Sequence, residues 1–184
     1  MIINITLNVG FMVNRMHFRK IYKVGLTSID NIVKVVKKLK KGDLKIITTN
    51  GSFDILHTGH IHTLEFAKSL GDVLIVGVNS DASVMAYKGK DRPIISEVER
   101  ALIVASLKSV DYVFIFKEKD PVSWIKKIKP HIHVKGKDRT MEQIIERHIL
   151  KEIGAKFVFV PIIKGKSSTN IIKKIIALSK TTLN

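Results

Sequence analysis

The stretch Thr49-Asn50-Gly51-Ser52-Phe53-Asp54-Ile55-Leu56-His57-Thr58-Gly59-His60 decides the fold. It follows the apolar run 44–48, which has the composition of a strand. It precedes a segment in which Ile61, Leu64 and Ala67 recur at helical spacing. The stretch is therefore the turn between a strand and a helix. Because the first backbone N–H groups of a helix have no partner within the helix, this turn also offers a binding site for phosphate.

Two histidines lie in this turn. His57 and His60 stand at the start of the helix, where the helix dipole places partial positive charge, and Gly59 between them lets a ligand approach the backbone. By spacing alone, the two residues are equally a metal-binding pair or ordinary polar loop residues. The preceding Gly-Ser-Phe-Asp turn and the strand–helix context favour two imidazoles directed at a bound phosphate.

Composition limits the classes of function. The 184 residues are enough for one domain with a short appendage, and no cysteine is present to form disulfides or to bind zinc. This fits a cytoplasmic location. The net charge of +16, from 32 basic and 16 acidic residues, suits a polyanionic ligand such as a nucleotide, a sugar phosphate or a nucleic acid. A chain rich in Lys, Ile and Asn also acquires such a charge for compositional reasons.

The N-terminal residues do not form part of the predicted fold. Residues 1–13 resemble the apolar part of a signal peptide, but Asn4 and Asn8 interrupt them and no cleavage site follows. No apolar run approaches the roughly 18 residues of a membrane-spanning helix. We expect an N-terminal arm at 1–27 and a single folded domain at 28–180.

Strands and helices alternate along the domain. Short apolar strands separated by amphipathic helices are typical of a parallel sheet that is covered on both faces. We therefore predict an α/β fold, a doubly wound parallel sheet of the Rossmann-like kind, with ligands at the carboxyl ends of the strands. The predicted strands are 44–49, 72–78, 111–116, 131–135 and 156–160, and the predicted helices are 28–41, 58–70, 96–108, 120–129, 141–153 and 168–178.

A basic segment follows the second predicted strand. Lys88-Gly89-Lys90-Asp91-Arg92 places three cations in five residues, and Arg100 lies in the next helix. By itself the segment is a solvated loop, but beside a phosphate site it would neutralise charge on a triphosphate. Arg100 is either a residue of the helix surface or a phosphate contact, and we expect the contact.

Two later segments also lie where a ligand would bind. His131 and His133 share one face of their strand, but a metal pair there lacks further obvious ligands. Lys135 and Gly136, at the tip of the same strand, are better site candidates. The hydroxyl groups of Ser167, Ser168 and Thr169 are either ordinary helix caps or, together with Gly165 and Lys166, a second anion cradle.

No Ser-His-Asp or Cys-His nucleophile is apparent in the sequence. None is needed if a phosphate oxygen of one substrate attacks the α-phosphorus of a nucleotide directly. Catalysis then consists of positioning the reactants and stabilising the charge of the transition state.

The turn residues carry a resemblance to the nucleotidyltransferase superfamily, whose signature is His-x-Gly-His after a Gly-x-Phe-Asp turn. Within it, the chain resembles the heptose 1-phosphate adenylyltransferases over roughly residues 28–178. Three runs point to that branch: Val78-Asn79-Ser80-Asp81-Ala82-Ser83, Val134-Lys135-Gly136-Lys137-Asp138 and Ser167-Ser168-Thr169-Asn170-Ile171-Ile172.

The resemblance implies transfer of AMP from the substrate ATP to a heptose 1-phosphate, with release of pyrophosphate and a need for Mg²⁺. It implies a precursor role in lipopolysaccharide synthesis, a separate sugar kinase, and a homodimer as one possible assembly. From the residues alone, we expect no metal site made of protein ligands. The residues that the resemblance would assign to catalysis are His57, His60 and Lys88. Those that it would assign to nucleotide binding are Asn50, Gly51, Phe53, Gly59, Asn79, Asp81, Arg92, Arg100, Lys135, Gly136, Asp138, Ser167, Ser168 and Thr169.

The sequence departs from this branch in places that bear on the acceptor. Lys137 replaces a usual glycine, Ser168 replaces a common threonine, and 139–153 is unlike the family. A cytidylyltransferase acting on a phosphorylated alcohol such as glycerol 3-phosphate therefore stays an alternative. A basic nucleic-acid-binding protein would require aromatic residues interleaved with Lys and Arg. The chain has few aromatics, so we expect neither a nucleic acid nor a membrane as partner.

Overall fold

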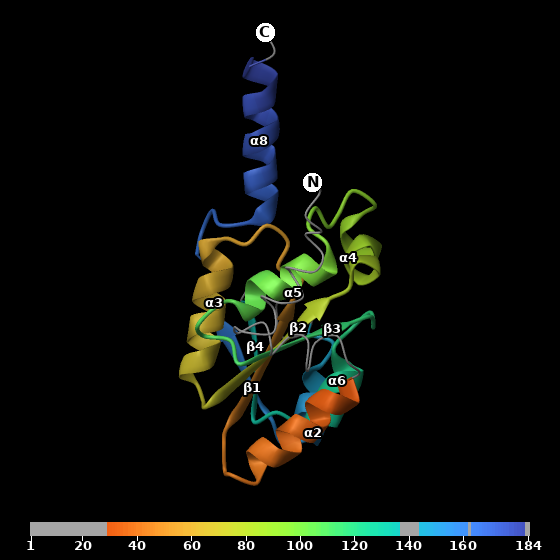
Figure 1. Ribbon diagram of the computed structural model, residues 1–184, viewed down its shortest axis with the longest axis vertical. Coiled ribbons are helices and arrows are strands. Elements are labelled where there is room, and N and C mark those ends of the chain that lie inside the picture. Colours follow the sequence, from red (N-terminus) through yellow and green to blue (C-terminus); the bar gives the residue numbers. More distant parts are fainter. Residues whose placement is uncertain (1–28, 137–143, 162, 183–184) are drawn as a thin grey trace, which may run out of the picture.

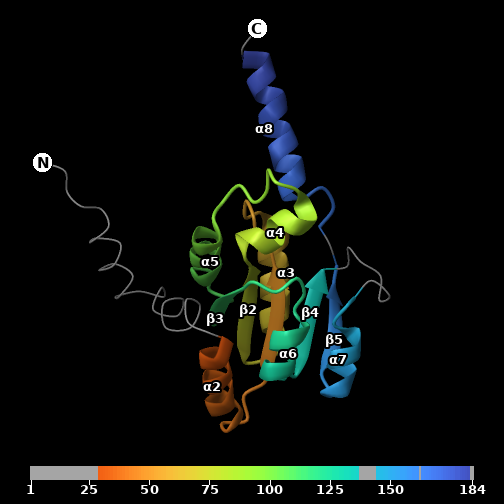
Figure 2. The ribbon, with the colours of Figure 1, turned by 90° about the vertical axis from the view of Figure 1, so that its right-hand side faces the viewer.

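Five parallel strands form one sheet in the order β3-β2-β1-β4-β5 (Figures 1 and 2). The computed structural model describes residues 29–136, 144–161 and 163–182. The expected N-terminal arm at 1–27 lies outside these ranges. The strands are β1 (Ile46–Gly51), β2 (Val73–Asn79), β3 (Tyr112–Phe116), β4 (Ile132–Gly136) and β5 (Lys156–Val160).

Helices cover both faces of the sheet, which confirms the predicted doubly wound architecture. On one face, α3 and α5 pack against the sheet, and on the other face α2, α6 and α7 do so (Figure 2). The described helices are α2 (Ile29–Lys40), α3 (Thr58–Ser69), α4 (Asp81–Lys88), α5 (Glu97–Ala105), α6 (Val122–Ile128), α7 (Arg147–Glu152) and α8 (Ser168–Thr182).

Side-chain alternation in the strands builds two cores. In β1, Ile47 faces the α3/α5 side, where it joins Leu64 of α3 and Val104 of α5. Its neighbour Ile46 faces the α2/α6/α7 side with Trp124 of α6. All of β2 is buried, because its run of Val, Leu, Ile and Gly is covered on both faces.

The order of the strands reverses between β1 and β4. The chain moves from β1 outward to β2 and β3, then returns to the other side of β1 to form β4. At such a switch point the connections from the two central strands leave toward opposite faces, which opens a crevice at their carboxyl ends. The turn that holds His57 follows β1, and Lys135 lies near the end of β4, so both residues belong to this edge.

The secondary structure differs from the prediction in a few places. Helix α4 was not predicted, since it has only eight residues; Ser80 caps it by accepting a hydrogen bond from the Ser83 backbone (3.2 Å). Lys88 therefore ends a helix instead of opening a loop. The predicted helix 141–153 is described only from 144 onward, where α7 begins at Arg147. Helix α5 ends at Ala105, three residues earlier than predicted, with Ser106 as its C-cap.

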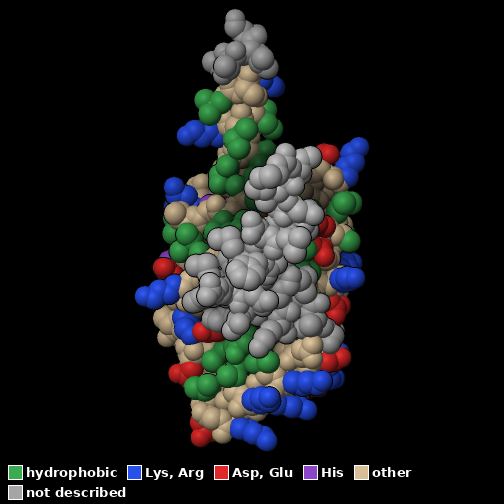
Figure 3. Space-filling model, in the orientation of Figure 1, with side chains coloured by type: hydrophobic (Ala, Val, Ile, Leu, Met, Phe, Trp, Pro, Cys, Tyr) green, Lys and Arg blue, Asp and Glu red, His purple; other side chains and the backbone are tan. Residues whose placement is uncertain are grey.

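Helix α8 stands away from the rest of the domain, at the carboxyl end of the sheet (Figures 1 and 2). Its side chains Ile175, Ile176 and Leu178 are 58%, 49% and 58% exposed. Apolar side chains are visible along the helix in Figure 3. The first turn is anchored to the domain through Ser168, which is 8% exposed and donates to the backbone carbonyl of Asp54. No described helix has both the length and the apolar character needed to cross a bilayer.

Candidate active site

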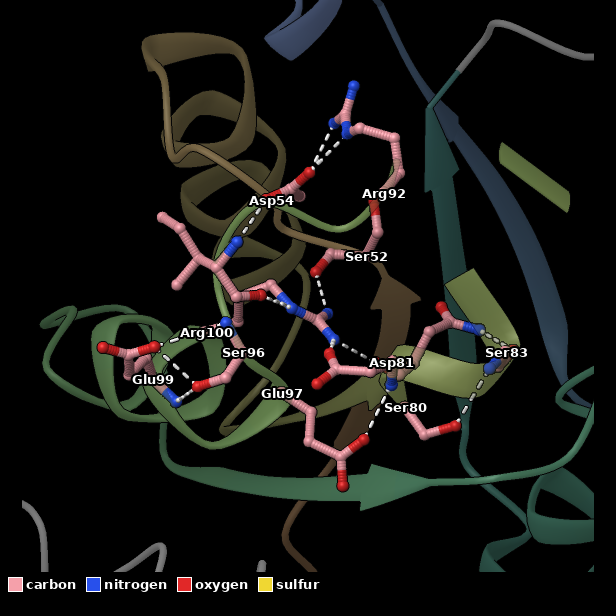
Figure 4. Close-up of polar contacts among 12 residues, drawn as sticks. Ser52, Asp54, Ser80, Asp81, Ser83, Arg92, Ser96, Glu97, Glu99 and Arg100 are labelled. Atoms are coloured by element: carbon pink, nitrogen blue, oxygen red, sulfur yellow. Dashed lines mark hydrogen bonds and ion pairs between the residues drawn. The ribbon is translucent and has the colours of Figure 1, made fainter. Parts of the chain in front are cut away.

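The turn between β1 and α3 is organised by a buried carboxylate. Asp54 is fully buried, and its Oδ1 accepts hydrogen bonds from the backbone N–H groups of Ile94 (3.0 Å) and Ile95 (3.1 Å). Its Oδ2 accepts a hydrogen bond from Nε of Arg92 (2.7 Å), as Figure 4 shows. Burial opposes ionisation of Asp54, but the two backbone bonds and Arg92 outweigh it and lower the pKa of Asp54. Asp54 thus ties the loop 89–96 to the turn.

The backbone on either side of this carboxylate has unusual angles. Phe53 and Ile55, on either side of Asp54, have positive φ values of 50° and 52°. Such angles are unfavourable for bulky residues and persist where the surrounding contacts fix them. Phe53 is 5% exposed, and its ring lies against His60 with a centroid distance of 5.4 Å. Phe53 was expected among the nucleotide-binding residues; in the structure its buried ring packs against the ring of His60.

The two histidines are stacked at the start of α3. The rings of His57 and His60 lie 3.8 Å apart between centroids and are inclined by 22°. The backbone N–H of His57 donates to Nδ1 of His60 (3.4 Å), so a neutral His60 carries its proton on Nε2. A Cβ on Gly59 would lie 3.0 Å from the ring of His57. Glycine is therefore the residue that leaves room for this stack.

Both histidines are neutral at pH 7. Burial, then the neighbouring His57 and Lys88, lower the pKa of His60 to about 4. Burial also lowers the pKa of His57, and Lys166 and Lys88 add to this effect. A neutral imidazole donates one hydrogen bond without carrying charge into the site. The pair can thus bind phosphate oxygens as donors.

Two lysines from different elements lie near the histidines. Lys88, in the last turn of α4, donates to the hydroxyl of Ser52 (3.0 Å). Lys166 precedes α8, and its Cβ lies 3.4 Å from the position that a Cβ on Gly59 would take. Lys88 was expected in the site. Lys166 was expected only as part of the anion cradle, because its sequence position gives no sign that it lies beside His57.

The N-termini of α3 and α8 meet at this turn. The hydroxyl of Ser168 donates to the backbone carbonyl of Asp54, and lies 3.4 Å from that of Ile55. The hydroxyl of Ser167 accepts from the backbone of Asn170 (3.1 Å), as an N-cap does. The segment 167–169 therefore does lie next to the histidine turn. The hydroxyls of Ser167 and Ser168 serve the protein's own backbone, and Thr169 is exposed.

Arg100 occupies a position that we did not expect. Its side chain is fully buried, and its guanidinium donates to the carbonyls of Ser52, Asn79 (2.8 Å) and Ile95 (2.9 Å) and to Asp81 Oδ1 (2.6 Å), as Figure 4 shows. These partners use its donors, so the expected direct contact of Arg100 with phosphate is wrong for this geometry. Arg100 instead joins the ends of β1 and β2 to the loop 89–96.

Two other expected ligands have structural partners in the same region. Asn79 is buried, and its side-chain amide donates to the hydroxyl of Ser83 (3.1 Å). Asp81 pairs with Arg100, and its backbone N–H donates to Glu97 (2.7 Å). Asn79 and Asp81 thus hold the end of β2 and the start of α4 in place. Of the residues expected at the end of β1, Asn50 and Gly51 are half-buried there.

The end of β4 carries a buried charged group. Lys135 Nζ lies 3.1 Å from Glu146 Oε1, and His133 Nε2 lies 3.4 Å from the same oxygen. Burial raises the pKa of Glu146, but His133 and Lys135 have a larger, opposite effect. The net result is a pKa of about 2. His133 also contacts the hydroxyl of Thr48 (2.8 Å). This group attaches α7 to the tip of β4, where Gly136 follows Lys135; Asp138 and Lys137 lie outside the described residues.

The histidines at the start of β4 and within it lie in different environments. The side chain of His131 is at the surface and its Nδ1 accepts from the backbone N–H of Ile46 (2.8 Å), whereas His133 is buried. Among the described residues, no group of three or more His, Cys, Asp or Glu side chains is arranged to hold a metal ion.

Comparisons with known proteins identify the family of the chain. The family model described as cytidylyltransferase-like matches residues 48–174, from the middle of β1 into α8. The chain belongs to the cytidylyltransferase-like family. It is a nucleotidyltransferase, as the His-x-Gly-His turn predicted.

Curated relatives of this nucleotidyltransferase are larger proteins. It is 44% identical over 151 residues to the protein named "Bifunctional protein HldE" from Geobacter metallireducens, and 47% identical over 150 residues to the protein of that name from Aliarcobacter butzleri. Each match covers 82% of this chain and 31% of the relative. The chain thus spans about a third of the length of these relatives.

Solved structures share the fold. The lipopolysaccharide core biosynthesis protein from Thermoplasma volcanium is 32% identical, with a TM-score of 0.55 over 67% of this chain and 99% of that one. The pantoate-beta-alanine ligase from Francisella tularensis has a TM-score of 0.56 over 75% of this chain and 66% of that one. At 16% identity, this second likeness supports the fold alone.

Proposed function

We propose that this nucleotidyltransferase transfers AMP from ATP to a sugar 1-phosphate, and that the sugar is a heptose. The observation that carries the nucleotide part is the stacked neutral pair His57 and His60 at the start of α3, next to the start of α8. Two helix N-termini and two neutral donors in one place match the phosphates of a nucleotide. The heptose rests on the family resemblance and on relatives named HldE.

In the proposed reaction, a phosphate oxygen of the acceptor attacks the α-phosphorus of ATP. The bond between the α-phosphorus and the bridging oxygen breaks, and pyrophosphate leaves with the electron pair. Nε2–H of His60 stabilises the charge that develops on the phosphoryl oxygens, and His57 contributes a second donor. Lys88 neutralises charge on the leaving pyrophosphate.

The proposal needs no protein-bound metal. The described residues provide no cluster of metal ligands, and the buried carboxylate of the histidine turn, Asp54, is paired with Arg92. We expect Mg²⁺ to enter the site bound to the nucleotide substrate. The residue roles proposed for His57, His60 and Lys88 do not depend on it.

A second candidate is a cytidylyltransferase that acts on a phosphorylated alcohol such as glycerol 3-phosphate, because the matching family model is described as cytidylyltransferase-like. Pyrophosphate release distinguishes the two. We would measure kcat/KM with ATP and with CTP against a panel of sugar 1-phosphates and glycerol 3-phosphate. We expect ATP with a heptose 1-phosphate to exceed CTP by about 10²-fold. A CTP value equal to or above that for ATP would favour the second candidate, and no turnover with any pair would refute both.

The proposed reaction has further requirements. A kinase has to supply the sugar 1-phosphate, and we propose that it is a separate protein. The product would be a nucleotide-activated heptose for lipopolysaccharide synthesis in the cytoplasm. We also propose a homodimer, which light scattering of the full chain would test. The described residues give no reason to propose a nucleic acid as partner.

A further inference from the structure

Three basic side chains at the carboxyl edge of the sheet are already paired with carboxylates. An arginine or lysine in contact with a carboxylate adds little net charge for attracting a phosphate. Three such pairs lie around the candidate site: Arg92 with Asp54 (2.5 Å), Arg100 with Asp81 (2.6 Å) and Lys135 with Glu146 (3.1 Å).

The histidines add no positive charge either. His57 and His60 are stacked with their ring centroids 3.8 Å apart, and two imidazolium cations at that distance would repel each other strongly. A triphosphate bound over this pair therefore requires cations from elsewhere. Lys88 is one of them, and its Nζ is held 3.0 Å from the hydroxyl of Ser52.

Lys166 is the second cation that reaches the pair. Its Cβ lies beside Gly59, and none of the ion pairs among the described residues involves Lys166. Its backbone position is fixed on both sides. Gly165 turns the chain with a φ of 77°, and Ser168 anchors the first turn of α8 to the carbonyl of Asp54. The lysine is thus held at the junction of two helix N-termini.

We propose that Lys166 is a phosphate-binding residue of this site, forming with Lys88 a clamp on the triphosphate from two separate elements. This inference rests on the proposed nucleotidyl transfer. It adds a charged contact from the segment before α8, whose hydroxyls are engaged by the backbone. Because Lys88 and Lys166 both lower the pKa of His57, each acts electrostatically on the same ring.

The test compares Lys166→Met with Lys164→Met, which removes the same charge from the same exposed segment two residues earlier. Isothermal titration of each full chain would measure binding of a non-hydrolysable ATP analogue, of AMP and of inorganic tripolyphosphate. We expect Lys166→Met to weaken binding of the analogue and of tripolyphosphate about tenfold, as expected for the loss of one charge near a phosphate, and to leave AMP little changed. Lys164→Met should bind all three like the parent chain, and Lys166→Arg should restore most of the loss.

An NMR titration of the His57 ring provides a readout that does not depend on ligand. Removal of Lys166 should raise the pKa of His57, because Lys166 lowers it in the parent chain. Equal losses for Lys164→Met and Lys166→Met, or an unchanged affinity in Lys166→Met, would overturn the clamp. If the parent chain binds tripolyphosphate through Lys166 but binds no nucleotide, the proposed function fails and the phosphate contact stands.

Discussion

Replacement of Asp54 by asparagine tests the organisation of the site. The side chain keeps its size, but the buried charge that pairs with Arg92 is lost, and an amide N–H₂ group would face the arginine donors. Breaking a buried ion pair from one side costs about 3–5 kcal/mol. The Arg92 side chain is 13% exposed and can recover some hydration, so we expect a loss of about 3 kcal/mol in the free energy of unfolding.

Urea and thermal unfolding of the full chain would measure this loss. For a domain of this size, about 3 kcal/mol lowers Tm by roughly 6–12 °C. The matched control is Asp30→Asn, which breaks a surface pair with Lys127 at 3.4 Å. That change should cost no more than about 0.5 kcal/mol. If Asp54→Asn stays within about 1 kcal/mol of the parent chain, the carboxylate does not organise the loop 89–96 in the way described.

The pH dependence gives the same prediction an independent check. The pKa of Asp54 is lowered in the folded state, so its contribution to stability is present above the ordinary value of 3.8 and is lost as the pH falls below it. The difference in stability between Asp54→Asn and the parent chain should therefore narrow below pH 4. If the difference in stability between the two chains stays constant down to about pH 2.5, the charge of Asp54 is not what stabilises the fold.

His60→Ala should lower kcat by about 10²–10³-fold with little change in KM for ATP, because a donor to the transition state is lost; unaltered turnover would reduce His60 to a helix-cap residue. Lys88→Met should raise KM for the nucleotide and leave Tm unchanged, since Lys88 is exposed, and Lys90→Met is the control; equal losses of Tm and activity would indicate a structural role. Gly59→Ala should lower kcat, because the added Cβ lies 3.0 Å from the His57 ring, and a crystal structure with that ring unmoved would contradict this. Since the pKa of His60 is about 4, kcat/KM should be flat between pH 8 and 6 and decline toward pH 4; a midpoint near 6.5 would show an unperturbed histidine.

Local sequence signals predicted the parts of the site that depend on one turn. The strand before Asn50 and the helix after Gly59 follow from apolar spacing, and parallel βα units place strand ends at one edge. The meeting of 167–169 with the histidine turn was expected from that rule and is confirmed. The shared edge could be predicted because it depends on topology, not on individual contacts.

Long-range contacts could not be read from the sequence. Arg100 was expected to contact phosphate, yet its guanidinium bonds to Ser52, which lies 48 residues earlier, and only the fold brings the two together. Lys135 was expected to point to a ligand, but Glu146, in a segment unlike the family, pairs with it. Helix α4 was missed because its eight residues are too few to show a helical period clearly, and its Ser80 cap was not recognised.

The exposed part of α8 has a consequence for backbone dynamics. An isolated helix of 15 residues is marginally stable in water, so α8 depends on what its apolar side chains contact. Amide hydrogen exchange should therefore be slow near Ser168 and fast beyond Ile175 if α8 remains uncovered. Slow exchange along the whole helix would instead mean that another surface shields its apolar side chains. The exchange profile of this one helix thus reports whether the chain acts alone or in an assembly.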